Sequence, residues 1–235
     1  MLHRRLAIAI FICNSIWSSA QVTPAGPKFS APLRPLLQAL AKSGVSGSLA
    51  FSGHCTGFPR DLPHMRVPST SDGAPLQLAR ETFSDDPTMQ FSQDPDGTIR
   101  MKERGISTEL LDVKISHVPF ETNGVPLQYA AYNPDHALYY AILRAPEVSA
   151  FADAHDIQVP FVGMGGHGGS GQQLSADLPH ISGSMDNLTL SQALDRIVKT
   201  FPGIWVYENC PADGKRRVVL FSFYSLQNPG LFMEN

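Results

Sequence analysis

Two stretches of this chain, about 115 residues apart, carry the same short signals in the same order. The first signal, Leu62-Pro63-His64-Met65, returns as Leu178-Pro179-His180-Ile181. Any single match of this kind is expected by chance, but four in one order favour an internal repeat, and hence a fold of two related units. The other three matches pair Leu76 and Ala79 with Leu190 and Ala193, Pro87 with Pro202, and Asp96-Gly97 with Asp213-Gly214.

The second copy predicts a strand, a helix, a second strand, a turn and a third strand. Thr189 with Gln192 three residues later forms a capping box, and the apolar residues that follow keep a helical spacing up to Pro202-Gly203, which ends the helix. Strands are predicted over 204–207 and 217–224. The last strand does not alternate apolar with polar residues, so we expect it either to be covered on both faces or to lie at an interface.

The first copy predicts the same order from a weaker pattern. Three apolar residues mark a short helix, and two extended segments alternate apolar with polar residues. Such alternation implies that one face of this part of the sheet contacts water. The residues concerned are Leu76, Ala79 and Phe83 for the helix, and Met89, Phe91, Ile99 and Met101 for the two strands.

Outside the copies, a helix is predicted over 33–40 and a strand over 45–51 and another over 110–120. Asn133-Pro134 and Pro146 each open a further predicted helix. The sequence therefore predicts an α+β protein with two related βαββ-like modules and a partly helical insert between them. The expected divisions are a leader (1–20), an N-terminal helix–strand unit with the first module (21–106), the insert (107–162), a Gly-rich joint (163–177) and the second module (178–235).

The first 20 residues have the pattern of a secretory signal peptide. Arg4 and Arg5 precede a run of apolar residues, and Ser18 and Ala20 are the small residues of a cleavage site. The run is too short to cross a bilayer. We expect a protein that is exported, either periplasmic or secreted, with no membrane insertion after leader cleavage. The formal net charge of −3 gives no electrostatic reason to expect nucleic acid as a partner.

Export changes what the cysteines can do. Cys13 would leave with the leader, so that Cys55 and Cys210 remain. In an oxidising compartment, two cysteines favour a single intramolecular disulfide. Two free buried thiols, or a reactive Cys55 beside His54, stay open as alternatives.

We predict no catalytic residue, no cofactor and no metal site. Residues 163–168 satisfy the G-x-G-x-x-G pattern of dinucleotide-binding loops, but the segment after them lacks an apolar helical stripe and contains Pro179. The histidines have no metal-ligand spacing. Asp94-x-Asp96-Gly97 begins like a calcium loop but lacks the later ligands, so a turn is the better interpretation.

Trp205 and Tyr207 fall on one face of the predicted strand that follows the second helix. Aromatic residues are enriched at protein interfaces, so this pair is a candidate partner-binding face. Packing of both rings against the helix is the alternative.

Residues 181–224 resemble the short N-terminal (STN-like) module shared by secretins and TonB-dependent transducers, and residues 62–103 resemble it faintly. The resemblance implies a small α+β module that makes protein–protein contacts in the bacterial cell envelope. Only this fold and contact role are carried over, because the pore-forming part of those proteins has no counterpart in this sequence. The positions that carry it are Thr189, Leu190, Ala193, Leu194, Ile197 and Tyr207.

The function predicted on these grounds is that of a non-enzymatic module in the cell envelope. Its partner would be another envelope protein, which the sequence does not identify. An exported hydrolase with a site between the modules is one alternative. A protein that binds a small ligand or a glycan through the aromatic face is another.

Overall fold

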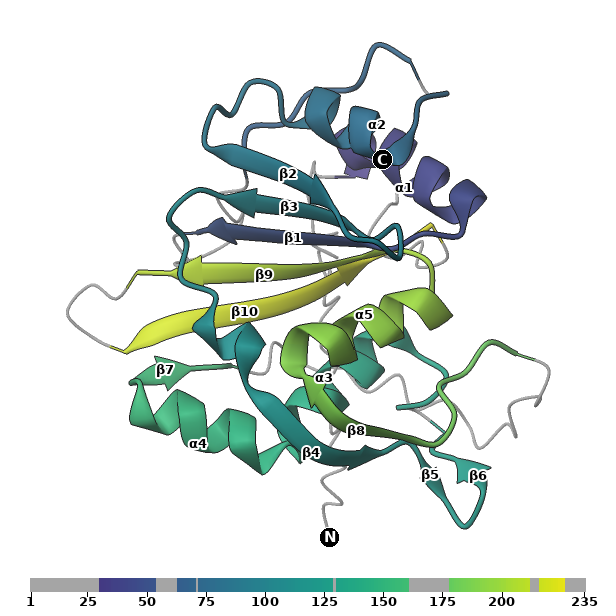
Figure 1. Ribbon diagram of the computed structural model, residues 1–235, viewed down its shortest axis with the longest axis vertical. Helices are drawn as coiled ribbons and strands as arrows, with labels where there is room; N and C mark the ends of the chain where they lie inside the picture. Colours follow the sequence, from purple (N-terminus) through teal and green to yellow (C-terminus); the bar gives the residue numbers. More distant parts are fainter. Residues whose placement is uncertain are drawn as a thin grey trace, which may run out of the picture.

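The computed structural model of the chain describes residues 30–53, 63–70, 72–128, 130–160, 178–211 and 216–226. Helices pack on a six-stranded mixed sheet in these residues, which confirms the α+β class (Figure 1). The sheet contains β1 (Gly47–Ser52), β2 (Met89–Gln93), β3 (Ile99–Glu103), β7 (Ile157–Gln158), β9 (Ile204–Cys210) and β10 (Arg217–Tyr224). Around it lie α1 (Ser30–Ser43), α2 (Pro75–Thr82), the 3-10 turn η1 (Glu109–Asp112), α3 (Pro134–Arg144), α4 (Pro146–Ala154) and α5 (Leu190–Thr200).

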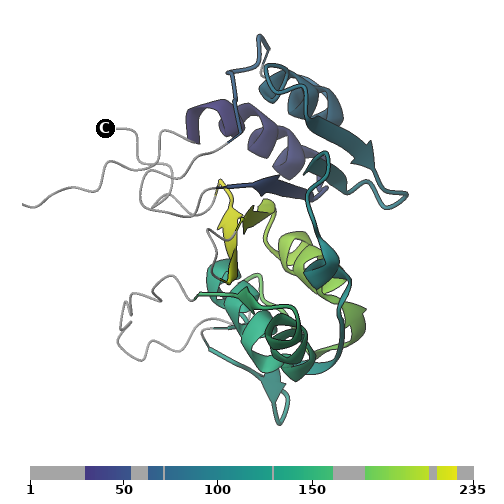
Figure 2. The ribbon, with the colours of Figure 1, turned by 90° about the vertical axis from the view of Figure 1, so that its left-hand side faces the viewer.

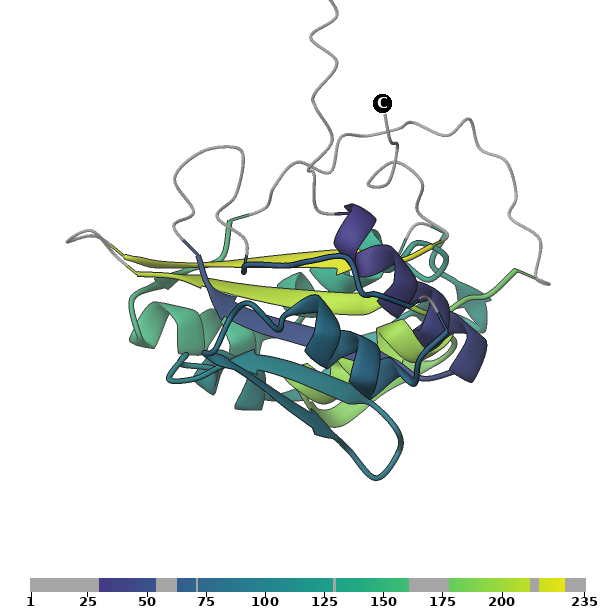
Figure 3. The ribbon, with the colours of Figure 1, turned by 90° about the horizontal axis from the view of Figure 1, so that it is seen from above.

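The sheet has the order β2-β3-β1-β9-β10-β7, and β1 is the strand that joins its two halves. On one side β1 runs parallel to β3, and on the other it runs parallel to β9. The pairs β2–β3 and β9–β10 are antiparallel. Figure 3 shows the strong twist that the sheet accumulates between β10 and β2.

Two apolar cores lie on opposite faces of this sheet. Helices α1 and α2 pack on β2, β3 and β1, whereas α3 and α5 pack on β10 and β9, with α4 beside β7 (Figure 2). Strand β9 contributes side chains to both cores. Ile204 and Val206 enter the core under α1 and α2, while Trp205 and Tyr207 enter the core under α3 and α5. A small sheet of β4 (Lys114–Pro119) and β8 (Ser184–Thr189) closes the latter core, and β5 (Glu121–Thr122) pairs with β6 (Val125–Pro126) beside it.

Local signals in the sequence set the ends of the helices. The capping box of Thr189 and Gln192 starts α5, and the Asn133 side chain accepts a hydrogen bond from the backbone of His136 at the start of α3. After α5, Gly203 lies so close to the backbone of Tyr224 that a Cβ atom would come within 2.3 Å of its carbonyl oxygen. Gly97 turns the β2–β3 hairpin with a φ of +89°, a conformation that glycine adopts without strain.

The second copy of the repeat has the expected order, β8-α5-β9-β10. The first copy keeps only the helix and the hairpin, α2-β2-β3, because residues 63–70 and 72–74 contain no strand. The hairpins β2–β3 and β9–β10 of the two units belong to one sheet, in which they flank β1, whereas β8 belongs to the small sheet with β4. Asp213-Gly214, the signal peptide, Cys55 and the whole of the Gly-rich joint lie outside the described residues.

The strand predicted over 110–120 is wrong at its beginning. Leu110 and Leu111 are both buried, and successive side chains of a strand point to opposite faces. The chain instead forms the turn η1, which places both side chains in one core, and β4 starts only at Lys114. In the described part of the chain, no helix is long and apolar enough to span a membrane.

Candidate functional site

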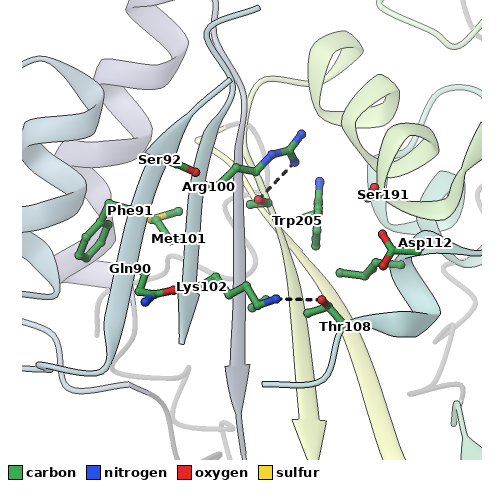
Figure 4. A pocket seen from close by; sticks show the side chains of 13 residues that line it. Gln90, Phe91, Ser92, Arg100, Met101, Lys102, Thr108, Asp112, Ser191 and Trp205 are labelled. Carbon is green, nitrogen blue, oxygen red and sulfur yellow. Dashed lines mark hydrogen bonds between the residues drawn. The ribbon is translucent and has the colours of Figure 1, made fainter. Parts of the chain in front are cut away.

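A groove of about 510 Å³ lies on the face of β2, β3 and β1 that α1 and α2 leave open (Figure 4). Its floor is polar because of strand alternation. Ile99 and Met101 of β3 enter the α1–α2 core, so Arg100 and Lys102 face the other way. The opposite wall is formed by α5 and by the segment that leads into η1.

At one end of the groove, an ion pair bridges the floor and α5. The Arg100 guanidinium donates two hydrogen bonds of 2.7 Å to the carboxylate of Asp195, whose side chain is 9% exposed. Asp94 contacts the same guanidinium at 2.6 Å. The Trp205 indole N–H also donates to Asp195, at 2.8 Å. Burial disfavours the charged guanidinium, but the hydrogen bonds and charges of the two aspartates outweigh it and raise the pKa of Arg100.

A second ion pair joins the same two elements farther along. Lys199, in the last turn of α5, lies 2.6 Å from the carboxylate of Asp96 in the β2–β3 turn. The hydrogen bond from Lys199, together with bonds from Thr98, holds the pKa of Asp96 below its usual value. The β2–β3 hairpin is thus attached to α5 through polar contacts over the groove rather than through an apolar core.

The other end of the groove is open and contains Lys102. Its ammonium donates to the Thr108 hydroxyl at 3.0 Å across the groove, as Figure 4 shows. Lys102 is half-buried, and no carboxylate of the described residues lies within 4.0 Å of it. Ser191 and Asp112 lie on the far wall of this end.

The open edge of the sheet, β2, runs beside the groove. Hydrogen bonds from Arg104 N to Thr88 O and from Asp94 N to Thr98 O bracket the hairpin. In an antiparallel ladder, every second residue directs its backbone N–H and C=O to the partner strand. Given these two bonds, the backbone groups of Gln90 and Ser92 point to β3, while those of Phe91 and Gln93 point away from the sheet. The sequence of β2, MQFSQ, contains no charge and no proline. Those are two of the features that normally protect a sheet edge from pairing with another chain.

Trp205 and Tyr207 share one face of β9, but both are buried in the core. Tyr207 packs edge-on against Phe221, with 5.5 Å between ring centroids, and its hydroxyl donates to Ser107 O. Burial raises the pKa of Tyr207 to about 12. Only Trp205 reaches the groove, so the candidate partner-binding face is a packing face for Tyr207 and a groove wall for Trp205.

The outer face of the β4–β8 sheet brings a serine, an aspartate and a histidine together. His117 Nδ1 lies 2.5 Å from the carboxylate of Asp186, and the Ser184 hydroxyl donates to the same carboxylate. These contacts, that of Ser184 first, lower the pKa of Asp186. Since the hydroxyl bonds to the carboxylate and not to the imidazole, the three residues lack the nucleophile–base contact of a catalytic triad. In the described ranges, no three histidine, cysteine or acidic side chains form a metal-binding group.

Comparison with known proteins found no relative. No family model matches the chain, and neither a curated protein nor a solved structure does. The resemblance to the STN-like module therefore rests on the sequence positions alone.

Sequence reasoning missed both of these features. The alternation of β2 and β3 predicted a wet face but gave no sign that a wall of α5 and η1 would turn it into a groove. The signal that was available is the uncharged segment MQFSQ between two acidic turns, which is typical of a strand whose edge is not protected.

Proposed function

We propose that this protein is an exported cell-envelope module that binds an extended segment of a partner protein as an additional strand at β2. The observation that carries the proposal is the outer edge of β2, where backbone groups of Phe91 and Gln93 face away from the sheet. In such strand addition, main-chain hydrogen bonds supply affinity and alternate side chains supply specificity.

The position of β2 supports this mode of binding. An added strand would place every second side chain on the same face as Gln90 and Ser92, which line the groove. Residues of the groove would then contact these side chains and select among partner sequences. The opposite edge of the sheet, β7, has only two residues, Ile157 and Gln158, and is therefore a poor template for pairing.

Two further points agree with the proposal without testing it. The predicted leader would deliver the chain to the envelope, and the STN-like resemblance implies protein–protein contacts there. Binding of a small ligand is a second candidate function, because the groove volume of about 510 Å³ lies within the range of ligand pockets, about 300–1,000 Å³.

Proline at position 93 tests strand addition. Gln93→Pro removes an N–H that points away from the sheet and leaves the β2–β3 hydrogen bonds in place. Because the Gln93 side chain also bonds to Gly97 O, at 3.2 Å, the matched control is Gln93→Ala, which loses that bond but keeps the N–H. Immobilised protein would be exposed to an envelope extract, and the retained proteins would be quantified by mass spectrometry.

We expect Gln93→Ala to retain the proteins captured by the wild type and Gln93→Pro to lose them, with unchanged circular dichroism in both. Equal capture by the two variants would contradict strand addition at β2. A set of proteins lost from both variants would indicate that the side chain, rather than the edge, is recognised.

A further inference from the structure

We infer that the open end of the groove binds a carboxylate, and that Lys102 is the residue that receives it. The carboxylate would belong to the peptide segment that lies beside β2, so the inference rests on the proposed function. It names the chemistry of the partner: an acidic side chain, or a free C-terminal carboxylate.

Lys102 has less charge compensation than the other cations near the groove. Arg100 on the same strand contacts two carboxylates, and Lys199 contacts one. Half-buried Arg196 donates to the backbone carbonyls of Ser182 and Ser184. Lys102 is half-buried as well, yet among the described residues its partner is a single neutral hydroxyl, that of Thr108. A partly desolvated cation with so little compensation favours an added negative group.

Hydrogen-bond donors from several elements line the same groove as Lys102. The Thr108 hydroxyl accepts from Lys102, which leaves its own proton to donate to a ligand. Ser191, whose hydroxyl forms a hydrogen bond of 3.0 Å with Thr189 Oγ1, lines the groove, as does Gln90. These groups come from three different elements, β2, α5 and the segment before η1, and a carboxylate accepts hydrogen bonds through both of its oxygens.

The charge balance of the groove favours a carboxylate over a phosphate. Lys102 supplies one positive charge, whereas Arg100 is already compensated by Asp195 and Asp94. Asp112 also lines the groove and adds a negative charge. With Lys102 and Asp112 in the same groove, a dianionic phosphate would leave twice the excess of negative charge that a monoanionic carboxylate leaves, so the groove disfavours phosphate more strongly.

Four ligands test the inference by titration of the full mature protein, followed by NMR. They are a five-residue peptide with blocked ends and one central glutamate, the same peptide with glutamine, the glutamine peptide with a free C-terminus, and inorganic phosphate. The variant is Lys102→Met, which keeps the length of the side chain and removes the charge. Its control is Lys114→Met, an exposed lysine on β4.

We expect the glutamate peptide to bind about tenfold more tightly than the glutamine peptide, as a charge-assisted hydrogen bond would give. Lys102→Met should abolish this preference and Lys114→Met should keep it. The preference should also weaken at high salt. A gain for the free C-terminus equal to that for glutamate would assign the site to terminal carboxylates as well as side chains.

Equal binding of the glutamate and glutamine peptides would overturn the inference. If the Gln93→Pro variant then failed to bind either peptide, strand addition at β2 would stand without the carboxylate site. Tighter binding of phosphate than of the glutamate peptide would replace the carboxylate assignment. If no peptide bound at millimolar concentration, both the inference and strand addition would fail.

Discussion

The units α2–β2–β3 and α5–β9–β10 have the same element order, yet they lie in opposite environments. Every residue of β9 is buried, whereas β2 has exposed side chains at Gln90, Ser92 and Gln93. Both hairpins flank β1, and their helices pack on opposite faces of the sheet. The comparison shows that one local arrangement serves as the interior of the molecule in one half and as its free edge in the other.

The difference follows from which strand of each hairpin pairs with β1. In the second unit the first strand, β9, pairs with β1, so β9 is enclosed between β1 and β10. In the first unit the second strand, β3, pairs with β1, so β2 becomes the edge. The sequences of the two strands fit these positions. Strand β9, IWVYENC, can be covered on both faces, whereas β2, MQFSQ, has one polar face.

The largest effect that we predict concerns the link between β1 and β9. Ser52 is in register with Asn209, and Gly53 N donates to Asn209 O at 3.0 Å. The chain therefore leaves β1 beside Cys210, two residues before Cys55. We predict a Cys55–Cys210 disulfide, which would close a loop of more than 150 residues and, in the chain-entropy model, stabilise the protein by about 5 kcal/mol.

Urea unfolding of the oxidised mature protein and of the double variant Cys55→Ser, Cys210→Ser measures this contribution. The two proteins should have equal stability in reductant, which controls for the loss of the side chains themselves. Thiol titration of the denatured, unreduced protein should find no free sulfhydryl. Two titratable thiols would refute the bridge and reopen a reactive Cys55.

The next effect tests the polar attachment of the first unit to α5. Arg100→Met would leave the buried Asp195 carboxylate with the Trp205 N–H as its remaining charge-stabilising partner. Removing one member of a buried pair is costly, and since the Arg100 side chain is 25% exposed we expect a loss of about 2 to 3 kcal/mol. Asp195→Asn should cost less, because Arg100 keeps Asp94. Urea titration of both variants measures this.

An equal loss in the two variants would contradict the expected difference, and no loss in either would mean that the two units are joined by packing alone. A double-mutant cycle of Arg100→Met with Asp94→Asn measures the interaction energy between Arg100 and Asp94. We expect this energy to be smaller than that between Arg100 and Asp195, since the Asp94 side chain is 37% exposed.

Features encoded by neighbouring residues were predictable from the sequence. The capping box of Thr189 and Gln192 and the helix start at Asn133-Pro134 occur where they were expected. The burial of both faces of β10 also followed from its unbroken apolar run, and Val219, Leu220 and Phe221 are all buried. In each case the information lies within a few residues of the chain.

Features that depend on distant partners were not predictable. That Trp205 and Tyr207 share a face follows from alternation, but whether α5 covers that face depends on the whole fold. The groove needs Lys102 and Thr108 to meet Ser191, which lies far away in sequence. The strand expected in the first copy fails where the backbone of Arg66 instead bonds to Thr82 O of α2.

The smallest effect that we predict is a difference between the two helix starts. Thr189 accepts a hydrogen bond from Gln192 N at 3.2 Å, whereas Ala74, at the same place before α2, has no side chain that can cap. Thr189→Ala should lower the free energy of unfolding by about 1 kcal/mol. Ala74 is exposed and extended, with φ −62° and ψ 142°, so Ala74→Ser can add the missing bond without strain.

We expect Ala74→Ser to raise the free energy of unfolding by about 0.5 to 1 kcal/mol in urea titrations. Ala74→Gly, which adds no oxygen but is tolerated at this position, is the control and should stabilise less. Because α2 holds the β2–β3 hairpin from the apolar side, the gain should also slow hydrogen exchange of the β2 amides that bond to β3. Stabilisation without slower exchange there would show that α2 unfolds independently of the edge strand, and the two helix–hairpin units would then differ in cooperativity as well as in burial.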